Sequence, residues 1–180
     1  MCLAAACCVA LGAPASARPA SAFRVRVFHF VDHSRTIRLP GGNRIPRPLV
    51  TVVRYPAAAG AHPLIVFAHG FALTPAAYNR LLRAWADAGF VVAAPIFPLE
   101  NANAPGGPNE SDLVNEPRDI SVVIDRLLKG PLADDIDSAK IAVAGHSDGA
   151  EAALAAAYDE RFRDRRIRAA IVMSGATIPG

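Results

Sequence analysis

Residues 140–157 read KIAVAGHSDGAEAALAAA, and this stretch decides the fold. The apolar run 140–144 is typical of a buried strand, and the alanine-rich run 150–157 favours a helix. Ser147 lies between them, with a glycine two residues away on each side, in the G-x-S-x-G pattern of a nucleophile elbow. Small neighbours let strand and helix approach closely while the serine takes a strained conformation that lifts its hydroxyl clear of the sheet. The alternative is a glycine-bounded loop in which the serine only caps the helix.

A second motif follows another apolar run, upstream of the first. Residues 64–68 (LIVFA) have the continuous hydrophobicity of a parallel strand covered on both faces, and they lead directly into His69-Gly70-Phe71. In a sheet with a nucleophile elbow, the loop after this strand supplies one backbone N–H of the oxyanion hole, and the residue after the nucleophile supplies the other. Those donors are here Phe71 and Asp148. They would stabilise the negative charge that develops on a carbonyl oxygen.

Together with residues 78–95 and a predicted helix over 117–128, these motifs resemble those of serine esterases of the α/β-hydrolase superfamily. The group of greatest similarity holds bacterial proteins grouped with chlorophyllases, platelet-activating-factor acetylhydrolases and polyester-cleaving, cutinase-like enzymes. The resemblance covers Arg24 to the last residue, and its motifs are specific to the superfamily rather than to a substrate. It implies an α/β-hydrolase fold, with a mostly parallel sheet and helices on both faces. It makes Ser147 the nucleophile and Phe71 and Asp148 the oxyanion donors. Five further residues are assigned to the structure of the elbow and the oxyanion loop: Gly145, His146, Gly149, His69 and Gly70.

The chain departs from the superfamily pattern after its nucleophile. The triad of this fold runs in the order Ser, then Asp or Glu, then His. No histidine follows Ser147, because all five precede it: His29, His33, His62, His69 and His146. We therefore expect the acid and the base beyond Gly180, in a fold that here lacks its last strands and helices. The 180 residues alone are expected to have little esterase activity.

Two local alternatives for the base remain to be tested by geometry. His69 lies at the correct end of the sheet, but a histidine in this loop more often shapes the turn, and His146 is too close in sequence to turn back onto Ser147. A third set, Asp32-His33-Ser34, is adjacent in sequence on an extended segment. Successive side chains of such a segment point to opposite faces, so this set is not expected to form a proton relay.

The remaining pattern alternates strands and helices, as in a parallel sheet with helical crossovers. An antiparallel portion is predicted first, with residues 35–48 as the loop between its two strands. A helix from Pro75 to about Ala88 would carry a core-facing stripe and end at Gly89. Residues 96–116 form a long loop of the kind that is often functional. The stripe consists of Tyr78, Leu81, Leu82 and Trp85, and the predicted strands are 23–31, 49–55, 64–68, 90–94, 140–144 and 167–173.

Composition and charge exclude several classes of function. A hydrophobic content of 52% in 180 residues suffices for one substantial core. The net charge of +3 comes from scattered arginines, and the one dense run, 161–168, is interrupted by Asp164, so we interpret it as a solvated helix end. No phosphate-binding glycine motif and no Cys/His spacing typical of a metal site is present. We expect no cofactor, no metal and no nucleic-acid partner.

The first 17 residues resemble a secretory signal peptide. An apolar stretch from Cys2 to Gly12 is too short to span a bilayer and precedes Ala15-Ser16-Ala17, a cleavage pattern. Residues 18–180 are then the N-terminal portion of one hydrolase domain. All three cysteines lie in the leader, which lacks a basic start, so a truncated leader or a lipid anchor on Cys7 or Cys8 are the alternatives. The protein is expected to be secreted or periplasmic, without a stable membrane span.

These observations favour a serine hydrolase that cleaves carboxylic esters of lipid or polyester type through an acyl-enzyme on Ser147. The rival enzymatic hypotheses are a thioesterase, a lipase or a peptidase on the same scaffold. A rival from another class is a non-catalytic binding protein or remnant. The sequence predicts neither the individual ester nor the oligomeric state.

Overall fold

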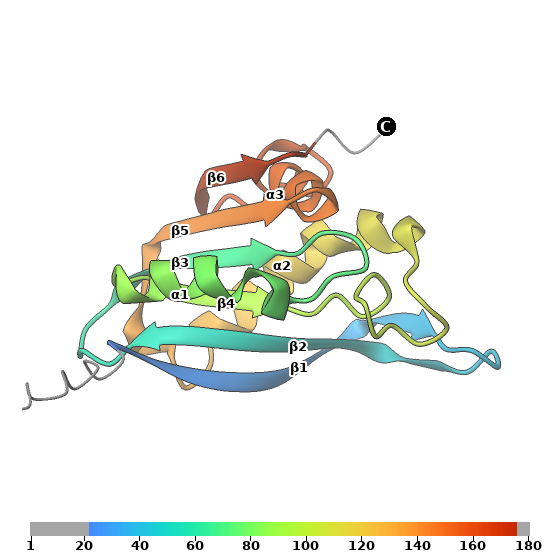
Figure 1. The fold of residues 1–180 in the computed structure, drawn as a ribbon, viewed down its shortest axis with the longest axis horizontal. Coiled ribbons are helices and arrows are strands. Elements are labelled where there is room, and N and C mark those ends of the chain that lie inside the picture. Colours follow the sequence, from blue (N-terminus) through green and yellow to red (C-terminus); the bar gives the residue numbers. More distant parts are fainter. Residues whose placement is uncertain (1–21, 176–180) are drawn as a thin grey trace, which may run out of the picture.

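The computed structural model describes residues 22–175, and a six-stranded sheet runs through it (Figure 1). The order of strands across the sheet is β1-β2-β4-β3-β5-β6. Their bounds are β1 Phe23–Arg38, β2 Arg44–Pro56, β3 His62–Ala68, β4 Val91–Pro95, β5 Ile136–His146 and β6 Ile167–Met173. The predicted leader, residues 1–17, lies outside the described residues.

Strands β4, β3, β5 and β6 pair in parallel, whereas β1 and β2 are antiparallel to each other and β2 is antiparallel to β4. The central strands β3 and β4 are almost wholly buried and apolar, as expected for strands covered on both faces. The prediction of a mostly parallel sheet is confirmed. Because β3 and β5 are parallel neighbours, the segments that follow them emerge at the same edge of the sheet.

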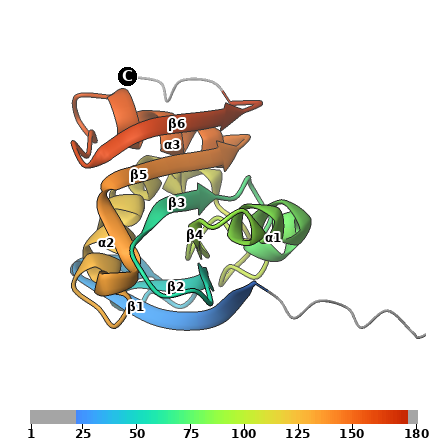
Figure 2. The same cartoon turned by 90° about the vertical axis from the view of Figure 1, so that its left-hand side faces the viewer.

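Helices cover both faces of the sheet, which confirms the second part of the fold prediction (Figure 2). The 3-10 turn η1 (Pro75–Tyr78) and helix α1 (Asn79–Asp87) pack on one face. Helices α2 (Glu116–Leu128) and α3 (Asp148–Tyr158) pack on the other, where most of the apolar core lies. Two further 3-10 turns, η2 (Glu110–Asn115) and η3 (Ala133–Asp135), precede α2 and β5.

The predicted core stripe of the first helix is confirmed. Leu82 is fully buried, and Tyr78, Leu81 and Trp85 are partly buried in the same apolar cluster. The helix begins through η1 at Pro75, whose ring is compatible with a first helical turn, and Gly89 follows its end with φ of 94°. This packing fixes η1 and α1 over β3, next to the loop that β3 enters.

The prediction of a loop over residues 35–48 is wrong. β1 continues to Arg38 and β2 begins at Arg44, so the turn is confined to residues 39–43. Pro46 and Pro48 suggested irregular chain, yet both lie in β2 and pair with β1. Within the described chain β4 pairs with β2 only over residues 51–54, so the prolines occupy a stretch with one paired neighbour, where a missing N–H is tolerated.

Two smaller predictions also need correction. The predicted loop over 96–116 ends in η2 rather than continuing without structure to α2. The basic run over 161–168 is not a helix end, because α3 stops at Tyr158. It forms the turn before β6 and the first two residues of that strand, and Arg166 in the turn pairs with Asp164 and Asp125. Among the described helices, none is long and apolar enough to cross a bilayer.

Candidate functional site

Ser147 lies at the junction of β5 and α3 in an unusual backbone conformation. Its φ is 54° and its ψ is −127°, whereas a residue with a side chain rarely adopts a positive φ. Such a conformation costs about 1–3 kcal/mol and persists only where surrounding structure fixes it. Here the Ser147 N–H donates to the Met173 carbonyl on β6 (2.9 Å), and the Ser147 carbonyl accepts from the Ala150 N–H in α3 (2.8 Å). The serine is therefore held on both sides of the turn.

The two glycines of the elbow are required by close packing. A Cβ atom on Gly145 would lie 2.0 Å from the Gly149 carbonyl oxygen, and one on Gly149 would lie 2.3 Å from the Ala68 carbonyl oxygen. Real Cβ atoms do not approach backbone oxygens so closely, so either position excludes any larger residue. The G-x-S-x-G spacing thus reports how tightly α3 packs on the ends of β5 and β3.

The loop after β3 lies directly against the elbow. A Cβ atom on Gly70 would be 3.2 Å from the Ser147 Cβ and 3.1 Å from the His146 carbonyl oxygen. In residues 22–175 the Phe71 N–H has no hydrogen-bond acceptor, and Asp148 begins α3, where an N–H has no intrahelical acceptor. The structure therefore brings together the two loops in which the sequence places the oxyanion donors, with both N–H groups available to a ligand.

Tyr78 joins these two loops through its hydroxyl group. The Gly70 N–H donates to the Tyr78 oxygen (3.1 Å), and the Tyr78 hydroxyl contacts His146 Nδ1 at 2.9 Å. Burial raises the pKa of Tyr78, so the phenol stays protonated at pH 7. Sequence analysis placed Tyr78 in the core stripe and missed this polar role. A tyrosine in a stripe of apolar residues was the available signal, because a buried hydroxyl needs a partner.

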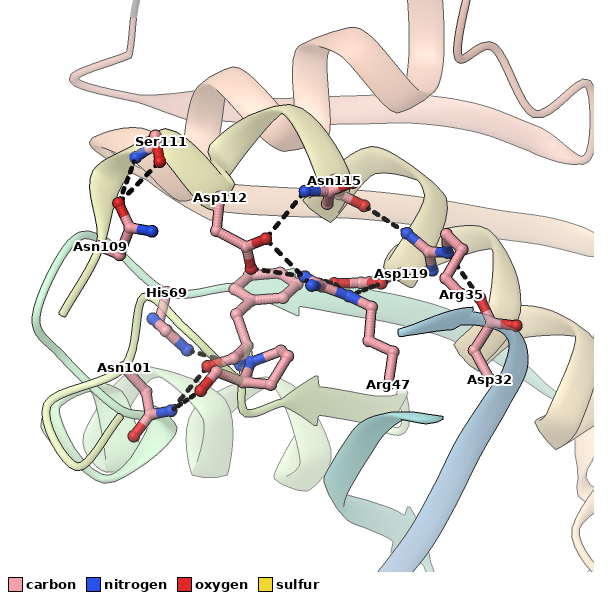
Figure 3. A network of polar contacts seen from close by, with 12 residues as sticks. Asp32, Arg35, Arg47, His69, Asn101, Asn109, Ser111, Asp112, Asn115 and Asp119 are labelled. Atoms are coloured by element: carbon pink, nitrogen blue, oxygen red, sulfur yellow. Dashed lines mark hydrogen bonds and ion pairs between the residues drawn. The ribbon is translucent and has the colours of Figure 1, made fainter. Parts of the chain in front are cut away.

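His69 has both ring nitrogens engaged away from Ser147. Its Nδ1 lies 3.0 Å from the Gly70 carbonyl oxygen, and its Nε2 accepts from the Phe97 N–H at 3.1 Å (Figure 3). The ring is fully buried, and this burial lowers the pKa of His69, so it is neutral at pH 7. The arrangement suits a residue that fixes the loop after β3 to the loop after β4, as the structural interpretation of His69 expects.

The set Asp32-His33-Ser34 lies at a bulge of β1. This strand forms one edge of the sheet and is separated from β5 by β2, β4 and β3. The Ser34 hydroxyl donates to Asp32 Oδ1 at 2.6 Å, and Arg35 contacts the second Asp32 oxygen at 2.6 Å. Burial alone would raise the pKa of Asp32, but the hydrogen bonds from Ser34 and Arg35 lower it to about 2. His33 takes no part in these contacts.

A buried network of ion pairs connects the β1–β2 hairpin to η2 and α2 (Figure 3). Arg47 contacts Asp112 at 2.7 Å and Asp119 at 2.6 Å, and Arg35 contacts Asp119 at 2.6 Å. Burial alone would lower the pKa of Arg47, but the two carboxylates raise it, so Arg47 stays charged. We call Arg35, Arg47, Asp112 and Asp119 the arginine network. It holds the start of α2 on the sheet, and sequence analysis did not anticipate it.

A second group of acids, two of them fully buried and one partly buried, adjoins Ser147, and we call it the carboxyl cluster. It consists of Glu100 in the loop after β4, Glu116 at the start of α2 and Asp148 at the start of α3. Glu100 lies within hydrogen-bonding reach of both other carboxyls, and the Ser147 hydroxyl donates to Asp148 Oδ1 at 3.2 Å. Burial raises the pKa of Glu100 to about 7, and that of Glu116 well above its usual range. Across residues 22–175, no group of three or more His, Cys, Asp or Glu side chains has a geometry that could hold a metal ion.

The family model for chlorophyllase matches residues 27–173. The chain belongs to the chlorophyllase family. It is 32% identical over 118 residues to chlorophyllase type 0 of Chenopodium album, a match that covers 62% of this chain and 33% of the plant protein. The chain thus spans about one third of the length of this chlorophyllase relative.

Solved structures of similar fold are hydrolases. A ferulic acid esterase from Streptomyces cinnamoneus superposes with a TM-score of 0.70 at 23% identity, over 93% of this chain and 63% of the esterase. An alpha/beta hydrolase from Penicillium sp. sh18 superposes with a TM-score of 0.60 at 17% identity, over 82% of this chain and 44% of that protein. These likenesses show that the chlorophyllase-family chain has the α/β-hydrolase fold, as its two motifs predicted.

Proposed function

We propose that this protein is a serine esterase in which Ser147 is the nucleophile. The observation that carries the proposal is the pairing of two features at one edge of the sheet. Ser147 has a φ of 54° at a strand-to-helix turn, and the Gly70-Phe71 loop packs against its Cβ with the Phe71 N–H unpaired among the described residues. A strained serine beside available backbone donors is the arrangement that acyl transfer requires.

In the proposed reaction the Ser147 hydroxyl oxygen attacks the ester carbonyl and gives a tetrahedral intermediate. The N–H groups of Phe71 and Asp148 would stabilise its oxyanion, and collapse would expel the alcohol and leave an acyl-enzyme that water hydrolyses. A base must take the serine proton, and an acid must orient that base. Following the triad order of this fold, we place both after Ser147 in the complete protein.

The substrate class is proposed from the relatives and from the rim of the site. The relatives include a chlorophyllase and a ferulic acid esterase. Phe71 and Leu73 expose 40% and 37% of their surface on the loop after β3, the loop whose Gly70 packs against Ser147. Apolar side chains at this position suit an ester with a hydrophobic acyl or alcohol part. We therefore propose lipid or polyester-like carboxylic esters.

The most direct kinetic test substitutes the nucleophile in the complete protein. Ser147→Ala should lower kcat for a p-nitrophenyl acyl ester by several orders of magnitude, as removal of a catalytic serine does. Ser138→Ala, an exposed serine on β5, is the matched control and should behave as wild type. Full turnover by folded Ser147→Ala would reject the proposal. Activity that disappears with a chelator would indicate metal-dependent chemistry instead.

Export is a separate proposal that rests on the leader alone. We propose that the protein is secreted or periplasmic, and that cleavage follows Ala17. Amino-terminal sequencing of the protein recovered outside the cytoplasm should begin at Arg18. Recovery of uncleaved protein in the cytoplasm would contradict it.

A further inference from the structure

Glu100 is the central member of the carboxyl cluster and also touches the oxyanion loop. Its side chain lies within hydrogen-bonding reach of Glu116 on one side and Asp148 on the other. Its backbone carbonyl accepts from the Ala72 N–H at 2.9 Å, one residue beyond Phe71. One residue thus contacts both segments that carry the proposed oxyanion donors. The function proposed above does not use it.

The cluster lacks the hydrogen-bond donors that ionised carboxylates would need. Within residues 22–175, five of its buried oxygens have no donor partner: both of Glu100, both of Glu116 and Oδ2 of Asp148. Ionised carboxylates only accept hydrogen bonds, so three of them together would repel one another and leave these oxygens unpaired. A protonated carboxyl is also a donor. Two protons therefore resolve the contacts: Glu116 keeps one and donates a hydrogen bond to Glu100, and Glu100 keeps the other and donates a hydrogen bond to Asp148 Oδ2.

Among the described residues, no positively charged side chain pairs with the acids of the cluster in place of those protons. Glu100 also faces Asp112 of η2, and Glu116 faces Asp112 and Asp119. The nearby guanidinium of Arg47 is committed to these two aspartates. Burial is the main reason why the pKa of Glu100 rises to about 7; the acidic Asp148 and Asp112 raise it further, whereas the hydrogen bond from Glu116 lowers it.

We propose that Glu100 is a positioning residue for the esterase reaction: its protonated carboxyl donates a hydrogen bond to Asp148 Oδ2 and so fixes the orientation of the carboxyl that lies beside Ser147. This inference rests on the proposed function. A protonated Glu100 orients Asp148 and disperses its charge beside the site where an oxyanion would form. An ionised Glu100 removes that hydrogen bond and adds a second negative charge at the same place, which opposes the oxyanion.

The resulting pH dependence has a defined direction. Below about pH 7 Glu100 keeps its proton and the Ser147–Asp148 arrangement is intact. Above that pH, kcat should fall while KM changes little, because the effect acts on the orientation and charge of the reacting groups rather than on substrate contacts. We expect the ratio of kcat for wild type to kcat for Glu100→Gln to decrease roughly 5-fold between pH 6 and pH 9, because the base that takes the Ser147 proton titrates in the same way in both proteins.

The test compares Glu100→Gln and Glu100→Leu with wild type in the complete protein, using a p-nitrophenyl ester from pH 6 to pH 9. Gln keeps an N–H donor toward Asp148 at every pH and should abolish the alkaline decrease in kcat. Leu removes the donor and should lower kcat about 10-fold at pH 6. Glu110→Gln, an exposed acid on η2, is the matched control and should keep the wild-type profile.

Two results would overturn the inference. One is an alkaline decrease in Glu100→Gln identical to that of wild type. The other is an unchanged kcat in folded Glu100→Leu. Should Glu100→Leu fail to fold, the pH profile of Glu100→Gln still decides. Failure of the proposed function gives a different result, namely full turnover by Ser147→Ala. If Ser147→Ala loses its activity but wild type and Glu100→Gln have identical pH profiles, only this inference is rejected.

Discussion

The arginine network and the carboxyl cluster are two groups of mostly buried acids on neighbouring parts of the molecule, and they are neutralised in different ways. In the first, two guanidinium groups balance Asp112 and Asp119 at distances of 2.6–2.7 Å. In the second, Glu100, Glu116 and Asp148 have no cation among the described residues, and the raised pKa values of the two glutamates indicate that they retain protons. One group thus depends on charge pairing, and the other on protonation.

The position of each group agrees with this difference. The arginine network joins β1 and β2 to η2 and α2, away from the elbow, and fixed ion pairs there hold the scaffold. The carboxyl cluster contacts Ser147 through Asp148, where a fixed charge would oppose the proposed oxyanion. Protons rather than a guanidinium group balance the acids near the proposed chemistry. Changes in the arginine network should therefore affect mainly stability, whereas changes in the carboxyl cluster should affect catalysis as well.

The largest effect is expected from breaking the arginine network. Arg47→Met would leave Asp112 and Asp119 buried without their main partner, which should lower the free energy of unfolding by about 3–5 kcal/mol. Urea denaturation followed by circular dichroism measures this. The control Arg44→Met removes an exposed arginine from the same strand and should cost less than about 0.5 kcal/mol. Equal decreases in the free energy of unfolding for both variants would show that the buried ion pairs stabilise the fold no more than an exposed arginine does.

The second effect concerns catalysis without loss of the fold. Phe71→Pro removes the backbone donor of the oxyanion loop and should lower kcat on the order of 10²-fold. Phe71→Met retains the N–H and should keep much of the activity. Phe71→Ala retains it too and should alter substrate preference more than rate, if the ring also lines the acyl site. Circular dichroism checks folding. A folded Phe71→Pro with wild-type kcat would show that Phe71 is not an oxyanion donor.

The third effect is a pH dependence of stability that belongs to the carboxyl cluster. The folded-state pKa of Glu100, about 7, lies above its ordinary value of 4.5, so the folded protein binds this proton more tightly than the unfolded chain. Its contribution is present in full below about pH 4.5 and is lost as the pH rises to about 7. Wild type should therefore lose on the order of 2 kcal/mol relative to Glu100→Gln between pH 5 and pH 8.

Chemical denaturation of both proteins at several pH values measures this difference. Asp32, whose pKa is lowered to about 2, should act in the opposite sense: its contribution is present above its ordinary pKa and is lost as the pH falls toward 2. Parallel stability curves for wild type and Glu100→Gln would mean that the carboxyl cluster is not protonated in the folded protein.

The smallest effect is expected at Tyr78. Tyr78→Phe keeps the ring that packs on Phe67 but removes the hydroxyl that joins Gly70 to His146. We expect a loss of about 1 kcal/mol in transition-state stabilisation, or roughly 5-fold in kcat, because the two loops would keep their packing and lose one bridge. Tyr158→Phe, an exposed tyrosine at the end of α3, is the control. Equal kcat values for the two variants would assign Tyr78 to packing alone.

Local sequence predicted the fold and the two site loops because their constraints are local. Gly145 and Gly149 are fixed by contacts within one strand-turn-helix unit, and the run into His69 ends a buried strand. The same local reading failed at the hairpin. In the sequence Pro46 and Pro48 suggest the end of a strand. They are tolerated in β2 because β4 pairs only with residues 51–54 of that strand, and the length of this pairing cannot be predicted from local sequence.

The two acid groups were not predictable, because their members look like ordinary solvated residues in the sequence. Glu100 and Glu116 both lie within residues 96–116, a segment that is rich in Pro, Gly and Asn and has no periodic pattern of hydrophobic residues. Their burial follows from the way the loop after β4 folds onto α2 and α3, which is a tertiary property. Arg47 likewise occupies an outwardly ordinary strand position and becomes buried only when η2 and α2 cover it.

Covalent labelling of Ser147 tests the central claim most directly. The complete protein is treated with a fluorophosphonate probe at pH 7, and its intact mass and labelled peptide are measured by mass spectrometry. One equivalent of probe is expected on the peptide that contains Ser147, with none on Ser147→Ala and unchanged labelling on Arg44→Met. An unlabelled wild-type protein that still hydrolyses p-nitrophenyl esters, or a label on another residue that abolishes turnover, would contradict Ser147 as the nucleophile.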